Sequence, residues 1–389
     1  MAIINRVAAR QDEFAAWRRD LHAHPELGYD LVRTAATVAE KLRSFGCDDV
    51  VSGIGRSGVV GVIRGRQTSS GRVIGIRADM DALPIQELVD HPYKSRHDGR
   101  MHACGHDGHT TMLLGAAAHL AETRNFDGTV VVIFQPAEEG GAGAKAMIDD
   151  GLMDRFAIQE VYGMHNMPGI PAGRFAMRYG PIMAAADRIA FRITGNGAHA
   201  AKPHLSIDPV MIGCQLHSAV QSIVSRNVDP LDNAVVSLTQ FNAGTAFNII
   251  PQTAEIRGTV RTLREATRAM IFQRLSDIAA ALSRQHAASV EFVLEEGYPV
   301  TVSHDANIDF IASVARDVVG EAAVDVAVAP MMGGEDFSFM LRERPGAFIW
   351  VGNGDSAGLH HPCYDFDDSV LPAGVSLWVR LAEMRMPTR

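Results

Sequence analysis

The sequence predicts an α/β protein in which a mostly parallel sheet forms a large domain and a smaller ferredoxin-like α+β domain is inserted into it. Length is the first observation, because 389 residues exceed the size at which a single hydrophobic core keeps growing. The second is an alternation of helical periodicity with short apolar runs. The third is a complete βαββαβ succession in the middle of the chain.

The N-terminal part begins with two predicted helices. Apolar residues recur at intervals of three and four over residues 12–24 and 31–46, and Gly46 supplies a stop for the second helix. Short runs rich in β-branched residues follow at residues 57–65, 71–79 and 128–136. The last two are almost continuously apolar, as in strands buried on both faces, and a helix is predicted between them over residues 109–123. These segments predict a βαβ unit in a largely parallel sheet.

The pattern changes after residues 163–185, a stretch with four glycines and three prolines that we interpret as a domain boundary. The next six elements are strand, helix, strand, strand, helix and strand, at residues 187–195, 207–226, 234–241, 253–262, 264–286 and 289–296. This order is that of ferredoxin-like domains. Because helix and strand alternation then resumes, we predict an inserted domain over residues 184–296 and a larger domain formed by residues 1–183 and 297–389.

Composition and charge narrow the class of protein. Hydrophobic residues make up 47% and charged residues 21% of the chain, as in ordinary globular proteins. The net charge of −9 and the absence of lysine and arginine clusters argue against a nucleic acid or an anionic membrane as partner, so a small molecule is expected. The chain begins without an apolar signal-type segment and has no run of roughly 18 apolar residues, so we expect a cytoplasmic protein.

The segment HACGHD at residues 102–107 holds two residues that could bind a metal. Cys104 and His106 are two positions apart, so in an extended or loop segment both side chains can point the same way, and Gly105 lets the backbone bend. Thiolate and imidazole are good ligands for several divalent metals. The alternative is that one histidine caps the helix that begins nearby while the others lie on the surface.

Paired carboxylates follow another predicted strand. Glu138 and Glu139 come after the apolar run 130–135, and the carboxyl ends of strands in open α/β sheets are where ligands bind. Adjacent carboxylates repel each other unless a cation or a proton lies between them. One could bind metal while the other moves protons. The alternative is two solvated glutamates at the start of a helix.

Further polar residues stand in similar surroundings. His165 ends a short apolar run, and His360 and His361 lie in a polar loop near the C-terminus. Together with Cys104, His106 and Glu139 they bring the candidate ligands to five or six, which is enough for two metal ions that share a bridging water. Asp79 and Asp81 follow the strand at 71–79 and could orient a ligating imidazole.

Nine sequence blocks carry a resemblance to a known family. In chain order they are DLHAHPELGY, RADMDALP, MHACGHDGHT, FQPAEEGGAGAKAMI, GMHNMPGIPAG, GNGAHAAKPH, FNIIPQTAEIRGTVRT, GGEDFSFM and LHHPCYDFDD. On these blocks the chain resembles, end to end, the M20 metallopeptidase family, in the branch of N-acyl amino acid amidohydrolases that includes hippurate hydrolases and plant auxin-conjugate hydrolases.

The resemblance implies a dinuclear metal centre in the larger, catalytic domain. The implied ligands are Cys104, His106, Glu139, His165 and His360. Glu138 is the implied general base, and His360 is chosen over His361 because it directly follows Leu359. A cysteine ligand is characteristic of this branch. The resemblance implies two divalent ions per subunit, and Zn, Mn, Ni and Co all remain open, as does the bridging ligand.

For the inserted domain the resemblance implies dimerisation and a contribution to the active site. His199 resembles a histidine that stabilises the oxyanion in the active site of the other subunit. Asn248 and Arg261 resemble substrate-binding residues, and the arginine could hold a substrate carboxylate. A homodimer or a dimer of dimers is therefore expected.

The expected activity is that of a metal-dependent amidohydrolase acting on linear amides, which cleaves N-acyl amino acids into a carboxylic acid and a free amino acid. A dipeptidase or carboxypeptidase of the same family is the nearest alternative. Two others are a thiol enzyme with Cys104 as nucleophile and His106 as its partner, and a metal-binding protein without catalysis.

Overall fold

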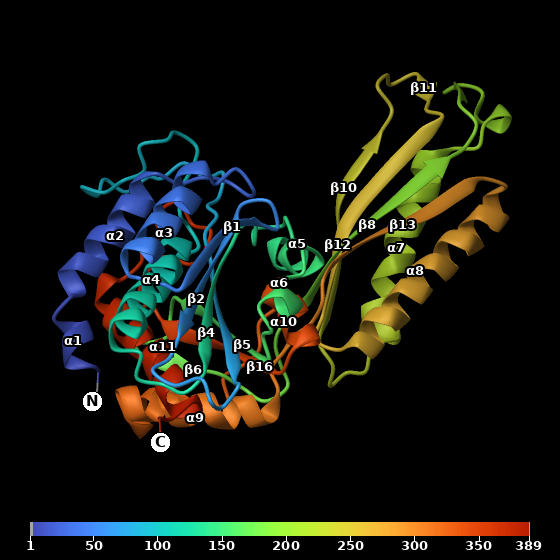
Figure 1. Cartoon of the computed structure of the whole chain (residues 1–389). Helices are drawn as coiled ribbons and strands as arrows, with labels where there is room; N and C mark the ends of the chain where they lie inside the picture. Colours follow the sequence, from blue (N-terminus) through green and yellow to red (C-terminus); the bar gives the residue numbers. More distant parts are fainter. Residues whose placement is uncertain (1–2, 389) are drawn as a thin grey trace. The chain divides into compact units, whose positions relative to one another are not determined.

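The computed structural model describes residues 3–388 and divides into two compact units (Figure 1). The first unit runs to Gly180 and includes Val302–Ala329 and the chain from Asp336 onward, and the second contains Pro181–Thr301 and Pro330–Glu335. The domain boundaries predicted from the sequence, after residues 183 and 296, concern functional domains and stay a prediction. Their outermost residues, 1–2 and 389, lie outside the described part of the chain. The short strands β7 (Pro181–Met183) and β14 (Thr301–Val302) lie where the chain passes between units.

The first unit is built on a mixed sheet whose centre is parallel. Its strand order is β1 (Asp49–Ile54), β2 (Gly58–Arg64), β4 (Thr129–Gln135), β3 (Val73–Asp79), β5 (Glu160–Met167), β16 (Gly346–Gly352), β6 (Phe175–Ala176) and β15 (Val324–Asp325). Strands β4, β3, β5 and β16 are mutually parallel, whereas β1 and β2 add antiparallel strands at one edge. Almost every residue of β3 and β4 is buried, as their apolar sequences predict.

Helices cover both faces of this sheet (Figure 1). One group comprises α1 (Asn5–Ala8), α2 (Gln11–Ala23), α3 (Val32–Ser44), α4 (His106–Thr123), α9 (Asp305–Val319) and α11 (Leu371–Arg385). The other comprises α5 (Gly143–Asp149), α6 (Leu152–Arg155) and α10 (Phe337–Glu343). Helix α4 connects β3 to β4, as predicted, and is buried nearly all round because its sequence has no polar face. It begins three residues earlier than predicted, so that His106 is its first residue.

The second unit has the predicted ferredoxin-like order. Its antiparallel sheet runs β10 (Ala234–Ala243), β12 (Thr253–Thr262), β8 (Ala185–Thr194) and β13 (Ser289–Tyr298), and it packs against α7 (Pro209–Arg226) and α8 (Glu265–His286). Buried and exposed residues alternate along β8, since only one face meets the helices. A two-stranded ribbon of β9 (Ala198–His199) and β11 (Ile249–Ile250) was not predicted from the sequence, because each strand has only two residues.

Among the described residues, no helix combines the length and the apolar character that a membrane crossing requires.

A buried ionic cluster joins α2 to the start of α4. His22 Nδ1 lies 2.8 Å from Asp107 Oδ2, its Nε2 lies 3.4 Å from Glu87 Oε1, and the guanidinium of Arg18 lies 3.5 Å from the same Asp107 oxygen. Burial alone would lower the pKa of His22, but the hydrogen bonds to Asp107 and Glu87 outweigh it and raise this pKa to about 9. The imidazolium is therefore part of the folded structure at neutral pH.

We expect the contribution of His22 to stability to depend on pH. Because the folded pKa is raised, the contribution is complete below the unfolded pKa of about 6.5 and is lost as the pH rises through about 9. In urea denaturation of chelator-treated protein, the free-energy difference between wild type and His22→Gln should be about 3 kcal/mol larger at pH 6 than at pH 9.5. An equal difference at both pH values would mean that the ring is not charged in the folded state.

Candidate metal centre

The carboxyl ends of the parallel strands gather the polar residues that the sequence analysis singled out. Asp79 is the last residue of β3, Glu138 and Glu139 follow the end of β4, and His165 lies near the end of β5. The chain passes from β3 to β4 on one side and then crosses to β5 on the other side of β3. Such a reversal of direction opens a crevice at the carboxyl ends of the strands, where ligands bind in α/β sheets.

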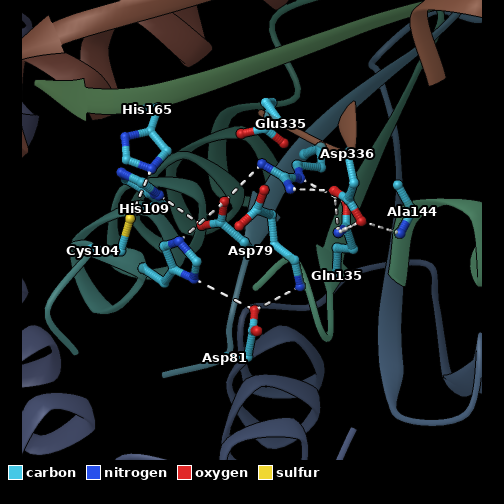
Figure 2. A network of polar contacts seen from close by, with 12 residues as sticks. Asp79, Asp81, Cys104, His109, Gln135, Ala144, His165, Glu335 and Asp336 are labelled. Atoms are coloured by element: carbon cyan, nitrogen blue, oxygen red, sulfur yellow. Dashed lines mark hydrogen bonds and ion pairs between the residues drawn. The ribbon is translucent and has the colours of Figure 1, made fainter. Parts of the chain in front are cut away.

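A tight turn brings Cys104 and His106 to the same place. Gly105 has φ = 85°, a conformation that favours glycine, and a Cβ at this position would lie 2.2 Å from the side-chain nitrogen of Asn166. Of the two conformations expected, extended or loop, the segment adopts the loop, with a left-handed turn at Gly105 that leads into α4. Cys104 Sγ lies 3.3 Å from His165 Nε2, and the two side chains point toward each other in Figure 2.

The five expected ligands come together in the first unit. Three groups have donor atoms that all lie within 4.8 Å of one another: Cys104, His106 and His165; Cys104, Glu139 and His360; and His106, Glu138 and Glu139. Cys104 belongs to two of these groups, and so do His106 and Glu139. Residues separated by more than 250 positions in the chain therefore form one continuous set of possible metal ligands.

Asp81 holds the two glutamates in place. Its carboxylate oxygens accept the backbone N–H groups of Glu138 at 3.0 Å and of Glu139 at 3.1 Å, and one of them lies 3.5 Å from His106 Nδ1. Its place after a strand predicts that Asp81 orients an imidazole. The structure adds that Asp81 also fixes the backbone from which both glutamate side chains extend.

His360 and His361 differ in their surroundings. His360 Nε2 lies 3.1 Å from Glu139 Oε1, and this contact raises the pKa of His360. His361 Nδ1 instead accepts the backbone N–H of Cys363. The geometry thus favours His360 over its neighbour as a member of the centre.

His109, the third histidine of the HACGHDGH segment, has a different role. Its Nδ1 lies 2.6 Å from Asp79 Oδ1, and its Nε2 accepts the backbone N–H of Asn166 at 2.8 Å. Both ring nitrogens are therefore occupied within the protein, which leaves none to bind a metal. Asp79 in turn accepts from Arg77 Nη1 at 2.7 Å (Figure 2).

Asp336 is a buried residue of the site region to which the sequence analysis assigned no role. It accepts hydrogen bonds from Arg77, from the side chain of Gln135 and from the backbone N–H of Ala144 (Figure 2). These bonds tie the ends of β3 and β4 to the start of α5. The GGEDFSFM block was part of the family resemblance, but a buried carboxylate cannot be distinguished from an exposed one by such a block alone.

The electrostatics of the centre suit a cation. Burial and the neighbouring Glu139 and Glu138 raise the pKa of Cys104 well above its ordinary value. Burial disfavours a charged His106, but Asp79 and Asp81 outweigh it and raise its pKa to about 10. Among residues 3–388, neither ring nitrogen of His106 makes a hydrogen bond. A buried imidazole without hydrogen bonds, beside a thiol and several carboxylates, fits a divalent metal ion, because such an ion would offset the negative charge and use the ring nitrogen.

The remaining expected site residues lie in the second unit, at opposite ends of its sheet. His199 pairs with Ile249 across the β9–β11 ribbon, where the backbone carbonyl of Asn248 accepts the N–H of Ala200 at 3.0 Å. Both side chains are exposed. Strand β12 begins next to the ribbon, and Arg261 is eight residues after its first residue. The rise per residue of a strand therefore places Arg261 about 26 Å from the end of β12 that lies at the ribbon. The structure therefore brings His199 and Asn248 together but keeps Arg261 apart from them within one chain.

Comparisons with known proteins agree with one another. The sequence model of the family described as Peptidase family M20/M25/M40 matches residues 75–384. A hippurate hydrolase from Campylobacter jejuni is 42% identical, covering 98% of this chain and 99% of that protein. An N-acetylcysteine deacetylase from Bacillus subtilis is 39% identical, covering 95% and 96%. The crystal structure of a dinuclear metal binding peptidase from the M20 family of Bacillus subtilis is similar, with a TM-score of 0.85, 33% identity and coverage of 98% and 99%.

Proposed function

This chain belongs to peptidase family M20/M25/M40, and on that premise we propose that it hydrolyses the amide bond of N-acyl amino acids in a metal-dependent reaction. The products are a carboxylic acid and a free amino acid. The observation that carries the proposal is the convergence of Cys104, His106, Glu139, His165 and His360 beside a further carboxylate, Glu138. The curated relatives that act on N-acyl amino acids match this chain over nearly its whole length.

Two divalent ions per subunit are proposed, held by those five residues. Their donor set combines a thiolate, three imidazoles and a carboxylate, which suits Zn, Mn, Ni and Co. Which of these metals binds therefore depends on the coordination geometry and on which metal is available. Bound there, the ions would polarise the amide carbonyl and lower the pKa of water from about 15.7 toward 7.

Glu138 is the proposed general base and acid. It is buried and belongs to the same group of donor atoms as His106 and Glu139. Its carboxylate takes a proton from the attacking water and returns it to the departing nitrogen, so that the amine leaves as a neutral group. Asp81 supports this role because it holds the backbone of Glu138 in a fixed position.

His199 is the proposed donor to the oxyanion. Its Nδ1 accepts the N–H of Ala201 at 3.1 Å, so the proton of the neutral ring lies on Nε2 and can be donated. Arg261 is the proposed partner of the substrate carboxylate, and Asn248 a second contact with the substrate. Burial lowers the pKa of Arg261, so an anion beside it would be stabilising.

A homodimer is part of the proposal. A substrate of the size of an N-acyl amino acid cannot reach both His199 and Arg261 of one chain, because about 26 Å of strand separates the two ends of β12. A second copy that supplies His199 and Asn248 to the first would remove this difficulty. A dimer of dimers is compatible with the same arrangement, and a cytoplasmic location remains a prediction from the sequence.

Metal dependence separates the proposed mechanism from one with Cys104 as nucleophile. We expect dialysis against EDTA to lower activity to a few per cent or less, and Zn, Mn, Ni or Co to restore it. We also expect the metal-loaded protein to keep its activity in iodoacetamide with Cys104 unmodified, measured by mass spectrometry of the Cys104 peptide, because this thiol is buried. Full activity in EDTA combined with inactivation by iodoacetamide would support the thiol mechanism instead.

A substrate panel tests the proposed reaction. Metal-free protein would be reloaded separately with Zn, Mn, Ni and Co and assayed with N-acetyl, N-benzoyl and indoleacetyl amino acids, with simple dipeptides as the comparison. We expect at least one N-acyl class to be cleaved with a higher kcat/KM than the dipeptides. Preferential cleavage of dipeptides would assign the chain to the peptidases of the family.

A further inference from the structure

Asn166 is a buried residue that contacts several parts of the candidate metal centre. It follows His165 at the end of β5, and its side chain is fully buried. Its backbone and side chain make hydrogen bonds with four residues, namely His165, His109, Cys104 and Tyr364. Three of these four belong to the centre or directly support it.

The backbone of Asn166 sets the orientation of two histidine rings. Its carbonyl oxygen accepts from His165 Nδ1 at 2.6 Å, and its N–H donates to His109 Nε2 at 2.8 Å. Since Nδ1 of His165 carries the proton, Nε2 has a free lone pair directed at Cys104 Sγ, 3.3 Å away. His109 completes the link to β3 through its 2.6 Å contact with Asp79.

The side chain of Asn166 holds the turn that contains Cys104. Its Nδ2 donates to the backbone carbonyl of Cys104 at 2.6 Å and lies 3.1 Å from His109 Nε2, while its Oδ1 accepts the hydroxyl of Tyr364 at 2.8 Å. An amide can donate at one end and accept at the other, which neither a carboxylate nor an apolar side chain can do. The left-handed turn at Gly105 packs directly against this amide, because a Cβ there would overlap with it.

We propose that Asn166 is a positioning residue of the metal centre, which sets the distance and direction between the Cys104 thiolate and the His165 imidazole. The proposal rests on the proposed metal site, and it concerns a residue that is not a ligand. Partners that orient metal ligands typically contribute about 10- to 100-fold to metal affinity. Tyr364 acts on the same amide from the C-terminal part of the chain, so its removal should have a smaller effect in the same direction.

Cobalt binding tests this role without reference to catalysis. Co²⁺ would be titrated into metal-free wild type, Asn166→Ala and Tyr364→Phe, with affinity measured by chelator competition and coordination by the thiolate-to-cobalt charge-transfer band. Asn307→Ala is the matched control, because Asn307 is a buried asparagine in the same unit that donates to the hydroxyl of Tyr162 at 2.9 Å. Thermal unfolding of each metal-free protein shows whether the fold is kept.

We expect Asn166→Ala to lower Co²⁺ affinity at least about 10-fold and to change the charge-transfer band, with Asn307→Ala equal to wild type. If Asn166→Ala does not fold, Tyr364→Phe must show the weaker affinity and the altered band. Wild-type affinity and spectrum in the folded variants would refute the positioning role. If wild type itself shows no thiolate band with Co²⁺, the proposed metal site is wrong and the positioning role fails with it.

Discussion

Replacement of Glu138 by glutamine should lower kcat by roughly three to four orders of magnitude while both metal positions stay filled. Glutamine keeps the size and the backbone hydrogen bond to Asp81 but cannot take a proton from water. The attacking water and the departing nitrogen both lose their proton carrier. The measurement combines steady-state kinetics on the best N-acyl substrate with metal content by mass spectrometry.

Glu139→Gln is the matched control for that experiment. Glu139 stands next in the chain, and its N–H also donates to Asp81, but it lies 3.1 Å from His360 and shares a group with Cys104. We expect this variant to lose metal and to regain part of its activity when metal is added in excess. A Glu138→Gln enzyme with near wild-type turnover, or one that has lost its metal, would remove the assignment of Glu138 as general base.

The elements with predicted bounds, up to residue 136 and in the inserted domain, lie within a few residues of the prediction, whereas strands such as β1 and β16 and the C-terminal helices were not predicted one by one. Buried parallel strands such as β3 and β4 must be almost wholly apolar. The helix between them is buried nearly all round as well, so its sequence is also mostly apolar and can be identified. The β9–β11 ribbon could not be predicted, since two-residue strands have no periodicity and depend on pairing across about 50 positions of chain.

The candidate site was only partly predictable. Cys104 and His106 stand two positions apart in a short polar segment, and the two glutamates follow the end of a strand, so local sequence was enough to suggest all four. His165 and the pair His360 and His361 were candidates from their surroundings, but the choice of His360 over His361 came from the family resemblance. The role of Asn166 was not predicted, because a buried asparagine has no periodic signature and its partners Cys104 and Tyr364 are distant in the chain. Position 109 shows the same limit, since only contacts with Asp79 and Asn166 reveal that this histidine has no free nitrogen.

Mixing two inactive variants should restore activity if His199 acts in the partner's site. His199→Ala alone should lower kcat about 10²- to 10³-fold, the usual cost of one oxyanion donor. In an equal mixture with Glu138→Gln after subunit exchange, half of the dimers are hybrids. One site of each hybrid has an intact Glu138 and receives an intact His199 from the other chain, so activity should reach about a quarter of wild type.

The reason for this expectation lies within the second unit alone. The ribbon that carries His199 and Asn248 is at one end of the sheet, and Arg261 is near the other end of β12. A short substrate can therefore contact either Arg261 or His199 of one chain, but not both. A complete site needs Arg261 from one copy and His199 from the other. Differently tagged variants would allow the hybrids to be isolated and assayed directly. Isolated hybrids no more active than either parent would show that His199 does not act across the dimer, and a fully active His199→Ala homodimer would remove it from the reaction.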